Sequence, residues 1–334
     1  MTAISVGDMA QQFSSTRNGN VIKNDLARLV ETLSTGKVAD ITKELGGETK
    51  RFSGIKYSLT QLDAYQKTTK ETAQILANVQ TVLDQVDQVR GSTAQRLLLV
   101  NDGSTIAQVD EAAQSSRSAF ETTIRTLNTQ IADRSLLGGA RVAQPPLASA
   151  EDILAALSTA IAGNTDPAAI ITIVDAWFDD AGGGFEAVGY MGDTGPMVQR
   201  QISETQTISI SARVDDPAIK EVLKGSALAA LASEIPALDR DSKMMLLQEA
   251  GKKLFDASSD LVAVQARVGF TEMLVSDAIA QNVSQETSLS ILRNELIGAD
   301  PFEAASKLQA VQLQLETHFA VTARMSQLSL LRYI

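Results

Sequence analysis

The chain has 334 residues, of which 44% are hydrophobic and 4% aromatic, and its formal net charge is -11 at pH 7. The absence of cysteine excludes disulfides, thiolate zinc sites and thiol nucleophiles. The acidic balance, without a lysine or arginine cluster, argues against nucleic acid as a partner, and no apolar run is long enough to span a membrane. Residues 1–20 lack the basic start and apolar core of a cleaved secretory signal.

The first predicted helix lies near the N-terminus and ends at Gly36. Its apolar residues recur at helical spacing and form one face: Ile22, Leu26, Leu29, Val30 and Leu33. An amphipathic helix gains most of its stability from covering such a face, so we expect this face to meet another helix.

A second predicted helix begins near Leu62 and carries a seven-residue repeat as far as Val100. Steps of three and four give Leu62, Tyr65, Thr69, Thr72, Leu76, Val79, Leu83, Val86, Arg90, Thr93, Leu97 and Val100. The sequence Asn-Asp-Gly at 101–103 breaks this helix, and Ser104 or Thr105 can cap the next one.

The third predicted helix is expected to end near residues 137–139, which read Leu-Gly-Gly. Its apolar residues are Ile106, Val109, Ala113, Phe120, Ile124, Leu127 and Ile131. Two helices joined by a short loop form an antiparallel hairpin, along which a further helix can pack.

Residues 144–237 read as an insertion, because they hold most of the prolines and a run of three glycines at 182–184. Helices are predicted at 149–162, at 167–178 with Asp166 as cap, and from 215–217 to roughly Leu231. Residues 206–214 alternate polar and apolar and predict a strand. Trp177 and Phe178 are expected in the core of this small mixed α/β domain.

The longest repeat runs from Leu247 to Leu296 without proline. It comprises Leu247, Ala250, Leu254, Ala257, Leu261, Val264, Val268, Thr271, Val275, Ala278, Asn282, Gln285, Leu289, Leu292 and Leu296. Asn282 and Gln285 are polar positions on this stripe, which in coiled coils commonly fix the register. At 1.5 Å per residue the helix is on the order of 70 Å long.

The last predicted helix begins at Asp300-Pro301-Phe302-Glu303, with Asp as cap and Pro in the first turn. Its apolar residues occupy more than one face: Leu308, Leu313, Val311, Leu315, Phe319, Val321, Met325, Leu328, Leu330 and Leu331. Several apolar faces imply several neighbours, one of which can be the N-terminal helix. We therefore predict that the terminal helices form an assembly interface through Leu26, Leu29, Leu33, Leu308, Val311, Leu315, Phe319, Leu328 and Leu331.

The predicted fold is mainly α: a long antiparallel coiled-coil rod built from both chain ends, with a small mixed α/β insertion. Three parts are expected. Terminal helices at 1–36 and 300–334 form the assembly core, 37–143 and 238–299 form the helical rod, and 144–237 forms the inserted surface domain.

Catalytic, cofactor and metal sites are not expected. His318, the single histidine, lies in the last helix and is interpreted as a surface or interface residue. The three glycines lack the Gly-Lys-Ser/Thr ending of a phosphate loop and predict a plain turn. The Asp pairs at 179–180 and 215–216 lack the spacing of a calcium loop and are read as caps and turns.

Several segments resemble the bacterial flagellin family, in the family's order. They read Leu-Ser-Thr-Gly-Lys at 33–37, Leu-Asp-Ala-Tyr-Gln at 62–66, Arg-Ser-Leu-Leu-Gly-Gly at 134–139, Gln-Ala-Arg-Val-Gly at 265–269 and Leu-Ser-Leu-Leu-Arg-Tyr at 328–333. The matches cover about two thirds of the chain and are most similar to the hook-associated members. Residues 38–47 depart from the family's usual pattern.

The resemblance implies a secreted structural protein of the bacterial flagellum, exported by the type III apparatus, rather than an enzyme. Its implied role is a junction adaptor between hook and filament. The implied partners are neighbouring copies of itself, other hook-associated proteins, flagellin, and an export chaperone at the C-terminal helix. Flagellin, the repeated filament subunit, is the alternative, and a coiled-coil signalling protein is a more distant one.

Overall fold

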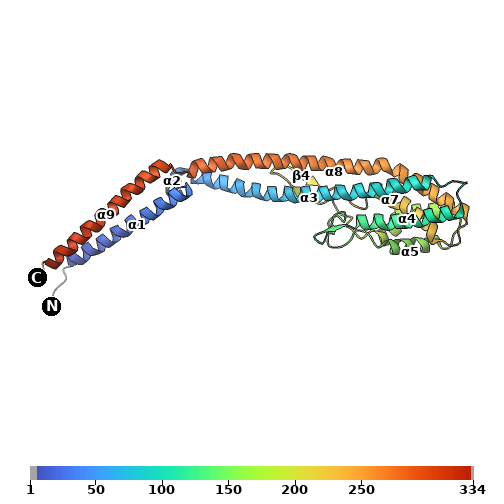
Figure 1. Ribbon diagram of the computed structural model, residues 1–334, viewed down its shortest axis with the longest axis horizontal. Helices are drawn as coiled ribbons and strands as arrows, with labels where there is room; N and C mark the ends of the chain where they lie inside the picture. Colours follow the sequence, from blue (N-terminus) through green and yellow to red (C-terminus); the bar gives the residue numbers. More distant parts are fainter. Residues whose placement is uncertain (1–5, 332–334) are drawn as a thin grey trace. The chain divides into compact units, whose positions relative to one another are not determined.

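The structure, a computed structural model, describes the backbone of residues 6–331 and the side chains of residues 9–325 apart from Gln11 and Glu44. The fold is mainly α, as the sequence predicts, with four long helices (Figure 1): α1 (Val6–Thr35), α3 (Thr49–Leu98), α8 (Arg240–Ile297) and α9 (Pro301–Leu331). The chain forms two compact units, residues 1–63 with 283–334 and residues 64–282, and both α3 and α8 contribute to each.

Within residues 64–282, α3 and α8 run antiparallel. The Gln265 side-chain amide donates to Asp84 at 2.9 Å, and that of Gln248 donates to the backbone carbonyl of Val100 at 2.9 Å. The predicted repeats are buried on both helices, which confirms the seam. Its buried members on α3 are Thr69, Thr72, Leu76, Val79, Leu83, Val86, Arg90, Thr93 and Leu97, and Val100 follows just after the helix. On α8 they are Leu247, Ala250, Leu254, Ala257, Leu261, Val264, Val268, Val275, Ala278 and Asn282.

Two of the polar stripe residues on α8 behave differently from each other. Asn282 is buried, and its side-chain amide donates to the backbone carbonyl of Ile202 at 2.9 Å. This hydrogen bond joins α8 to the segment around Ile202 and not to α3. Gln285 is exposed. The interpretation of both as register residues is therefore wrong for Gln285, because the buried stripe ends with Asn282.

The third helix, α4 (Ile106–Leu127), begins as predicted, with Thr105 and Gln108 forming a capping box. Its expected end near residues 137–139 is wrong, because the helix stops at Leu127. There the Asn128 amide exchanges two hydrogen bonds with the backbone of Leu147, at 2.9 and 3.0 Å. The chain then forms a two-stranded antiparallel ribbon, β1 (Gln130–Ile131) and β2 (Arg134–Ser135), whose two turn residues have positive φ.

The core of residues 64–282 is centred on α7 (Pro217–Glu234), capped by Asp216. Most of α7 is buried, since it packs along α4 and against α5 (Ala150–Ile161) and α6 (Pro167–Asp179). Gly225 lets α7 approach α8 closely, because a Cβ there would lie 2.9 Å from Cγ of Leu254. The helices of the predicted insertion thus share one core with α4 and α8.

An aromatic cluster closes one side of α6. Trp177 and Phe178 are buried, as predicted, and their ring centroids are 4.8 Å apart. Phe185 begins the π-helical turn η2 (Phe185–Gly189), and its ring stacks on that of Tyr190, the next residue after the turn, at a centroid distance of 5.8 Å. The glycine run before it is a turn packed on the indole: a Cβ on Gly184 would overlap the Trp177 ring. Gly183 and Gly184 therefore permit close packing, whereas Gly182, with φ of 71°, meets open space and serves the turn.

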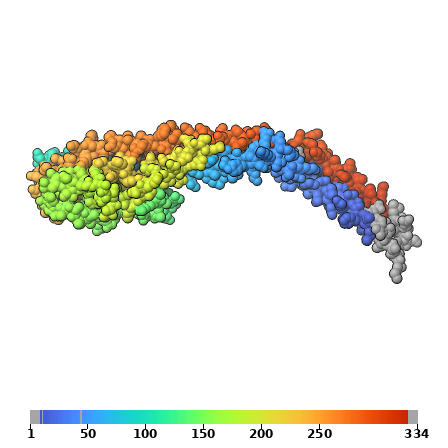
Figure 2. Space-filling view, turned by 180° about the vertical axis from the view of Figure 1, so that it is seen from behind, coloured from blue at the N-terminus to red at the C-terminus, as the bar shows by residue number. Residues whose placement is uncertain are grey.

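The predicted strand at 206–214 is real but shorter. It is β4 (Thr207–Ser209), paired antiparallel with β3 (Gln199–Gln201), and both views place this yellow segment beside α3 and α8 (Figures 1 and 2). The four strands form only two separate two-stranded ribbons among the described residues. The β content of the fold is consequently small.

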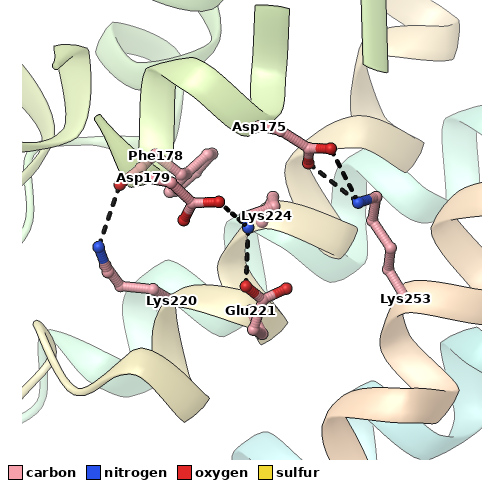
Figure 3. Close-up of polar contacts among 7 residues, drawn as sticks. All are labelled: Asp175, Phe178, Asp179, Lys220, Glu221, Lys224 and Lys253. Atoms are coloured by element: carbon pink, nitrogen blue, oxygen red, sulfur yellow. Dashed lines mark hydrogen bonds and ion pairs between the residues drawn. The ribbon is translucent and has the colours of Figure 1, made fainter. Parts of the chain in front are cut away.

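Ion pairs join α6 to α7 and to α8 (Figure 3). Lys224 on α7 is buried and donates to Asp179 at 2.5 Å and to Glu221 at 2.7 Å, while Lys253 on α8 pairs with Asp175 at 2.9 Å. Burial alone would lower the pKa of Lys224, but its two hydrogen-bonded carboxylates outweigh burial and raise that pKa above its ordinary value. Lys224 is therefore charged at neutral pH.

We expect removal of the two carboxylates to destabilise the protein more than removal of Lys224. Asp179→Ala with Glu221→Ala leaves a buried ammonium without a counter-ion, at a cost of about 3 kcal/mol in the free energy of unfolding, whereas Lys224→Met costs less than about 1 kcal/mol. Urea unfolding at pH 7 measures both variants. Because the pKa of Lys224 is raised, the ammonium's stabilisation is complete below pH 10.5 and is lost only as pH rises through the raised value. If the two variants lost the same free energy of unfolding, the carboxylates would not be acting as counter-ions of a buried ammonium.

Candidate assembly interface

Helices α1 and α9 lie side by side and antiparallel in the unit of residues 1–63 and 283–334 (Figure 1). The hydroxyl oxygens of Ser15 and Thr322 are 3.3 Å apart, and a Cβ on Gly19 would lie 3.0 Å from Nε2 of His318. His318 is thus half-buried at a helix–helix contact, as the sequence interpretation proposed. Gly19 is small enough to admit the imidazole.

Local sequence fixes the ends of the two helices as predicted. Gly36 follows α1 with φ of 65°, and its amide donates to the carbonyl of Thr32 at 2.9 Å. The Asp300 carboxylate accepts from the amides of Phe302 and Glu303 at 2.8 and 3.3 Å and caps α9. Two backbone hydrogen bonds link the segment after α1 to the segment before α9. The Val38 amide donates to the carbonyl of Ile297 at 2.9 Å, and the Ala299 amide donates to the carbonyl of Gly36 at 3.1 Å.

The predicted interface residues fall into three groups. Six of them are half-buried on the two helices: Leu26, Leu29, Leu33, Leu308, Val311 and Leu315. Phe319 is 52% exposed, with the Lys23 ammonium 5.6 Å from its ring centroid. The side chains of Leu328 and Leu331 lie outside the described residues. The pair α1–α9 therefore brings the two predicted faces into one unit and leaves them partly open to solvent.

A further set of large apolar side chains on α1 and α9 is more exposed than the predicted set. Its members are Met9, Phe13, Val21, Val30, Phe302, Leu313, Val321 and Met325. With Phe319 we call this set the open apolar surface. Large apolar side chains that stay exposed on a helix pair offer a surface on which further protein can pack. The sequence signal for this surface is the spread of apolar residues over more than one face of the last helix. These residues include Leu313 and Val321.

Two hollows lie along the pair and can receive side chains. One, of about 640 Å³, is bordered by Leu29 and Val311, and the other, of about 720 Å³, by Leu313, His318 and Val321. Both have mixed polar and apolar walls, as expected for a helix pair that packs against further helices. Each exposed apolar side chain that becomes fully buried contributes on the order of 1 kcal/mol beyond its present burial.

Among residues 9–325, no group of three or more His, Asp or Glu side chains is placed to hold a metal ion. Three of the four Asp residues considered for calcium have other partners: Asp179 pairs with Lys224, Asp215 with Arg213, and Asp216 caps α7 and pairs with Arg267. In the part of the chain that the structure describes, no helix is long and apolar enough to cross a membrane.

Comparison with solved structures gives a fold match. The chain is similar to a protein from Vibrio parahaemolyticus that is provisionally described as a flagellar hook-associated protein, with a TM-score of 0.54 and 11% sequence identity. The match covers 75% of this chain and 97% of that one. No protein-family model and no curated protein sequence matches the chain. The two proteins share a fold, so the resemblance noted in the sequence has a structural counterpart.

Proposed function

We propose that the chain is a structural subunit of the bacterial flagellum, acting as a junction adaptor between hook and filament. The fold match, which covers nearly all of the Vibrio parahaemolyticus protein, carries this proposal. The open apolar surface supports it, because a subunit that assembles through paired terminal helices needs such a surface on them. The role is one of assembly geometry and involves no catalysis, cofactor or metal.

In this proposal residues 1–36 and 300–334 form the assembly core through the predicted interface residues and the open apolar surface. Residues 37–143 and 238–299 form the helical wall around that core, and residues 144–237 face outward. The protein is secreted to the flagellum, where neighbouring copies, other hook-associated proteins and flagellin are its partners. An export chaperone binds the C-terminal helix before assembly, since an exposed apolar helix requires cover in a free subunit.

Deleting the gene in the bacterium that encodes it tests this role directly. We expect hooks without filaments and flagellin lost to the medium, and return of filaments when the gene is supplied from a plasmid. Hooks that bear no filament and leak no subunit would instead identify the chain as flagellin. Normal filaments with disturbed swimming behaviour would favour a signalling role and overturn the proposal.

A further inference from the structure

A hollow of about 680 Å³ lies in the unit of residues 64–282, between α3 and the two ribbons, and we call it the α3 groove. Its half-buried or buried apolar lining comprises Ile75, Leu136, Val142, Val198, Ile210 and Ala212. A volume of this size holds several apolar side chains of a partner. All of its lining residues belong to the unit of residues 64–282, and none of them is a member of the open apolar surface on α1 and α9.

An incompletely bonded arginine lines this groove. The Arg200 side chain is 19% exposed, and within the described residues it makes no hydrogen bond, its Nε being buried without a partner. Its nearest carboxylate is that of Glu71 at 3.7 Å, on a side chain that is itself 71% exposed. A largely desolvated guanidinium that makes no side-chain hydrogen bond is costly, so an anionic oxygen within hydrogen-bonding distance of Arg200 would be stabilising.

Comparable arginines of the same unit show that this arrangement is unusual for the fold. Arg90 is buried and bonds Asp87, the carbonyl of Leu254 and the hydroxyl of Ser258. Arg213 holds Asp215 through two hydrogen bonds and also donates to the carbonyl of Gly195. The chain therefore supplies hydrogen-bond acceptors to Arg90 and Arg213, whereas Arg200 has, in the part of the chain that the structure describes, only the Glu71 carboxylate at 3.7 Å.

The rim of the α3 groove is cationic. Lys70 and Arg134 border it and are exposed, and Glu71 is the one carboxylate among the lining residues that the structure describes. The chain as a whole has a formal net charge of -11. A cationic, apolar groove on an acidic protein is complementary to an acidic, apolar surface, and the same chain carries one.

The matching surface lies on the outer face of α8, and we call it the α8 ridge. Phe270, Met273 and Asp277 are spaced i, i+3 and i+7, so they share one face, and all three are exposed. Val262 is 51% exposed two turns before Phe270 on the same face. Between residues 254 and 282 the acidic residues are Asp256, Asp260, Glu272 and Asp277, and the single basic residue, Arg267, is paired with Asp216.

Groove and ridge lie at different places on the unit, so one copy can use both at once. Val198 and Arg200 of the β3 segment border the α3 groove, whereas Phe270 borders a separate hollow with Ile208 of β4. A contact between two different patches is heterologous, and it propagates from copy to copy into a ring or a helical array.

We infer that the α3 groove of one copy binds the α8 ridge of a second copy. Phe270 and Met273 enter the apolar groove as helix anchors, and Asp277 supplies a carboxylate that can accept hydrogen bonds from Arg200. The inference rests on the proposed function in one respect, because assembly places copies side by side. It names the lateral contact that such an assembly would use outside the terminal helices.

Engineered cysteines test the contact on the full chain, which contains no cysteine of its own. An affinity-tagged Arg200→Cys protein is mixed with untagged Asp277→Cys protein at high concentration and treated with a short bis-maleimide. We expect a tagged–untagged cross-link that neither variant forms alone. Lys252→Cys, also on α8 and exposed, is the matched control and should not link to Arg200→Cys. Equal yields for Asp277 and Lys252 would overturn the contact.

Charge reversal gives a second, independent test. Arg200→Glu and Asp277→Arg are each expected to weaken self-association, measured by sedimentation velocity, by at least about tenfold, because each places like charges together. The double variant should recover most of the loss, and Lys252→Glu should have no such effect. Asp277 is exposed, so its variant folds whatever happens to Arg200→Glu. Single variants that associate like Lys252→Glu, or a double variant that recovers nothing, would refute the inference.

These outcomes can be separated from those of the gene deletion. Filaments that persist without the gene would refute the flagellar role, and the cross-link would still report whether groove and ridge meet. Missing filaments with no specific cross-link would keep the role and discard this contact.

Discussion

A Leu313→Asp protein is expected to fold as the parent chain does and to fail to assemble. Leu313 is 65% exposed on α9, so an aspartate there costs the free chain little beyond about 0.5 kcal/mol of helix propensity. In an assembly that buries the open apolar surface, the same carboxylate would lie among apolar side chains, at a cost of several kcal/mol. Plasmid complementation of the deletion strain measures assembly, and circular dichroism of the purified chain measures folding.

Two other substitutions on α9 make this test specific. Leu315→Asp should lose assembly and also loosen the α1–α9 pair, because Leu315 is half-buried. Gln309→Asp introduces the same charge at an exposed polar position and should assemble normally. If Leu313→Asp supported filaments as well as Gln309→Asp does, the open apolar surface would not be an assembly surface.

A Gly251→Leu substitution is expected to destabilise the protein strongly, although it replaces one residue without a charge by another. Gly251 is buried where α3 and α8 approach, and a Cβ there would lie only 2.9 Å from Cβ of Leu97. Further side-chain atoms must therefore push the two helices apart, which costs about 3 kcal/mol in the free energy of unfolding. Urea unfolding followed by circular dichroism measures this loss.

The other glycine in the α8 repeat is the matched control. Gly269 has no neighbouring atom within 4 Å of an added Cβ, so Gly269→Leu meets open space. It should raise the free energy of unfolding by about 0.5–1 kcal/mol, because glycine is a poor helix former. A fall in the free energy of unfolding for Gly251→Leu together with a rise for Gly269→Leu would establish close packing at Gly251. A destabilisation shared by both would show instead that leucine is poorly tolerated anywhere on α8.

The helical seam was predictable because its signal is local and repeated. Apolar residues recur every three or four positions along α3 and α8, so single polar residues such as Thr72 did not obscure the apolar stripe. Helix caps were predictable for the same reason, as Asp166, Asp216 and Asp300 act within three residues of their partners. The end of α4 was not predictable, since it depends on a bond between Asn128 and Leu147, nineteen residues away.

The assembly interface was predictable only in outline. Apolar residues on several faces of the last helix indicated more than one neighbour, and α1 is one of them. Which side chains α1 would cover and which it would leave open depends on how the two helices are rotated against each other. That rotation follows from contacts such as Gly19 with His318, which join residues at opposite ends of the chain.

By itself the sequence determined the mainly α class, the long paired helices and the absence of cysteine chemistry. These follow from composition and from hydrophobic period, which each segment carries independently of the others. Only the tertiary structure decided that α7 is the centre of a core shared with α4 and α8, and that Gly251 permits the approach of α3. It alone revealed that, within the described residues, the Arg200 side chain makes no hydrogen bond. Burial and hydrogen-bond satisfaction belong to pairs of residues far apart in the chain, so no local pattern encodes them.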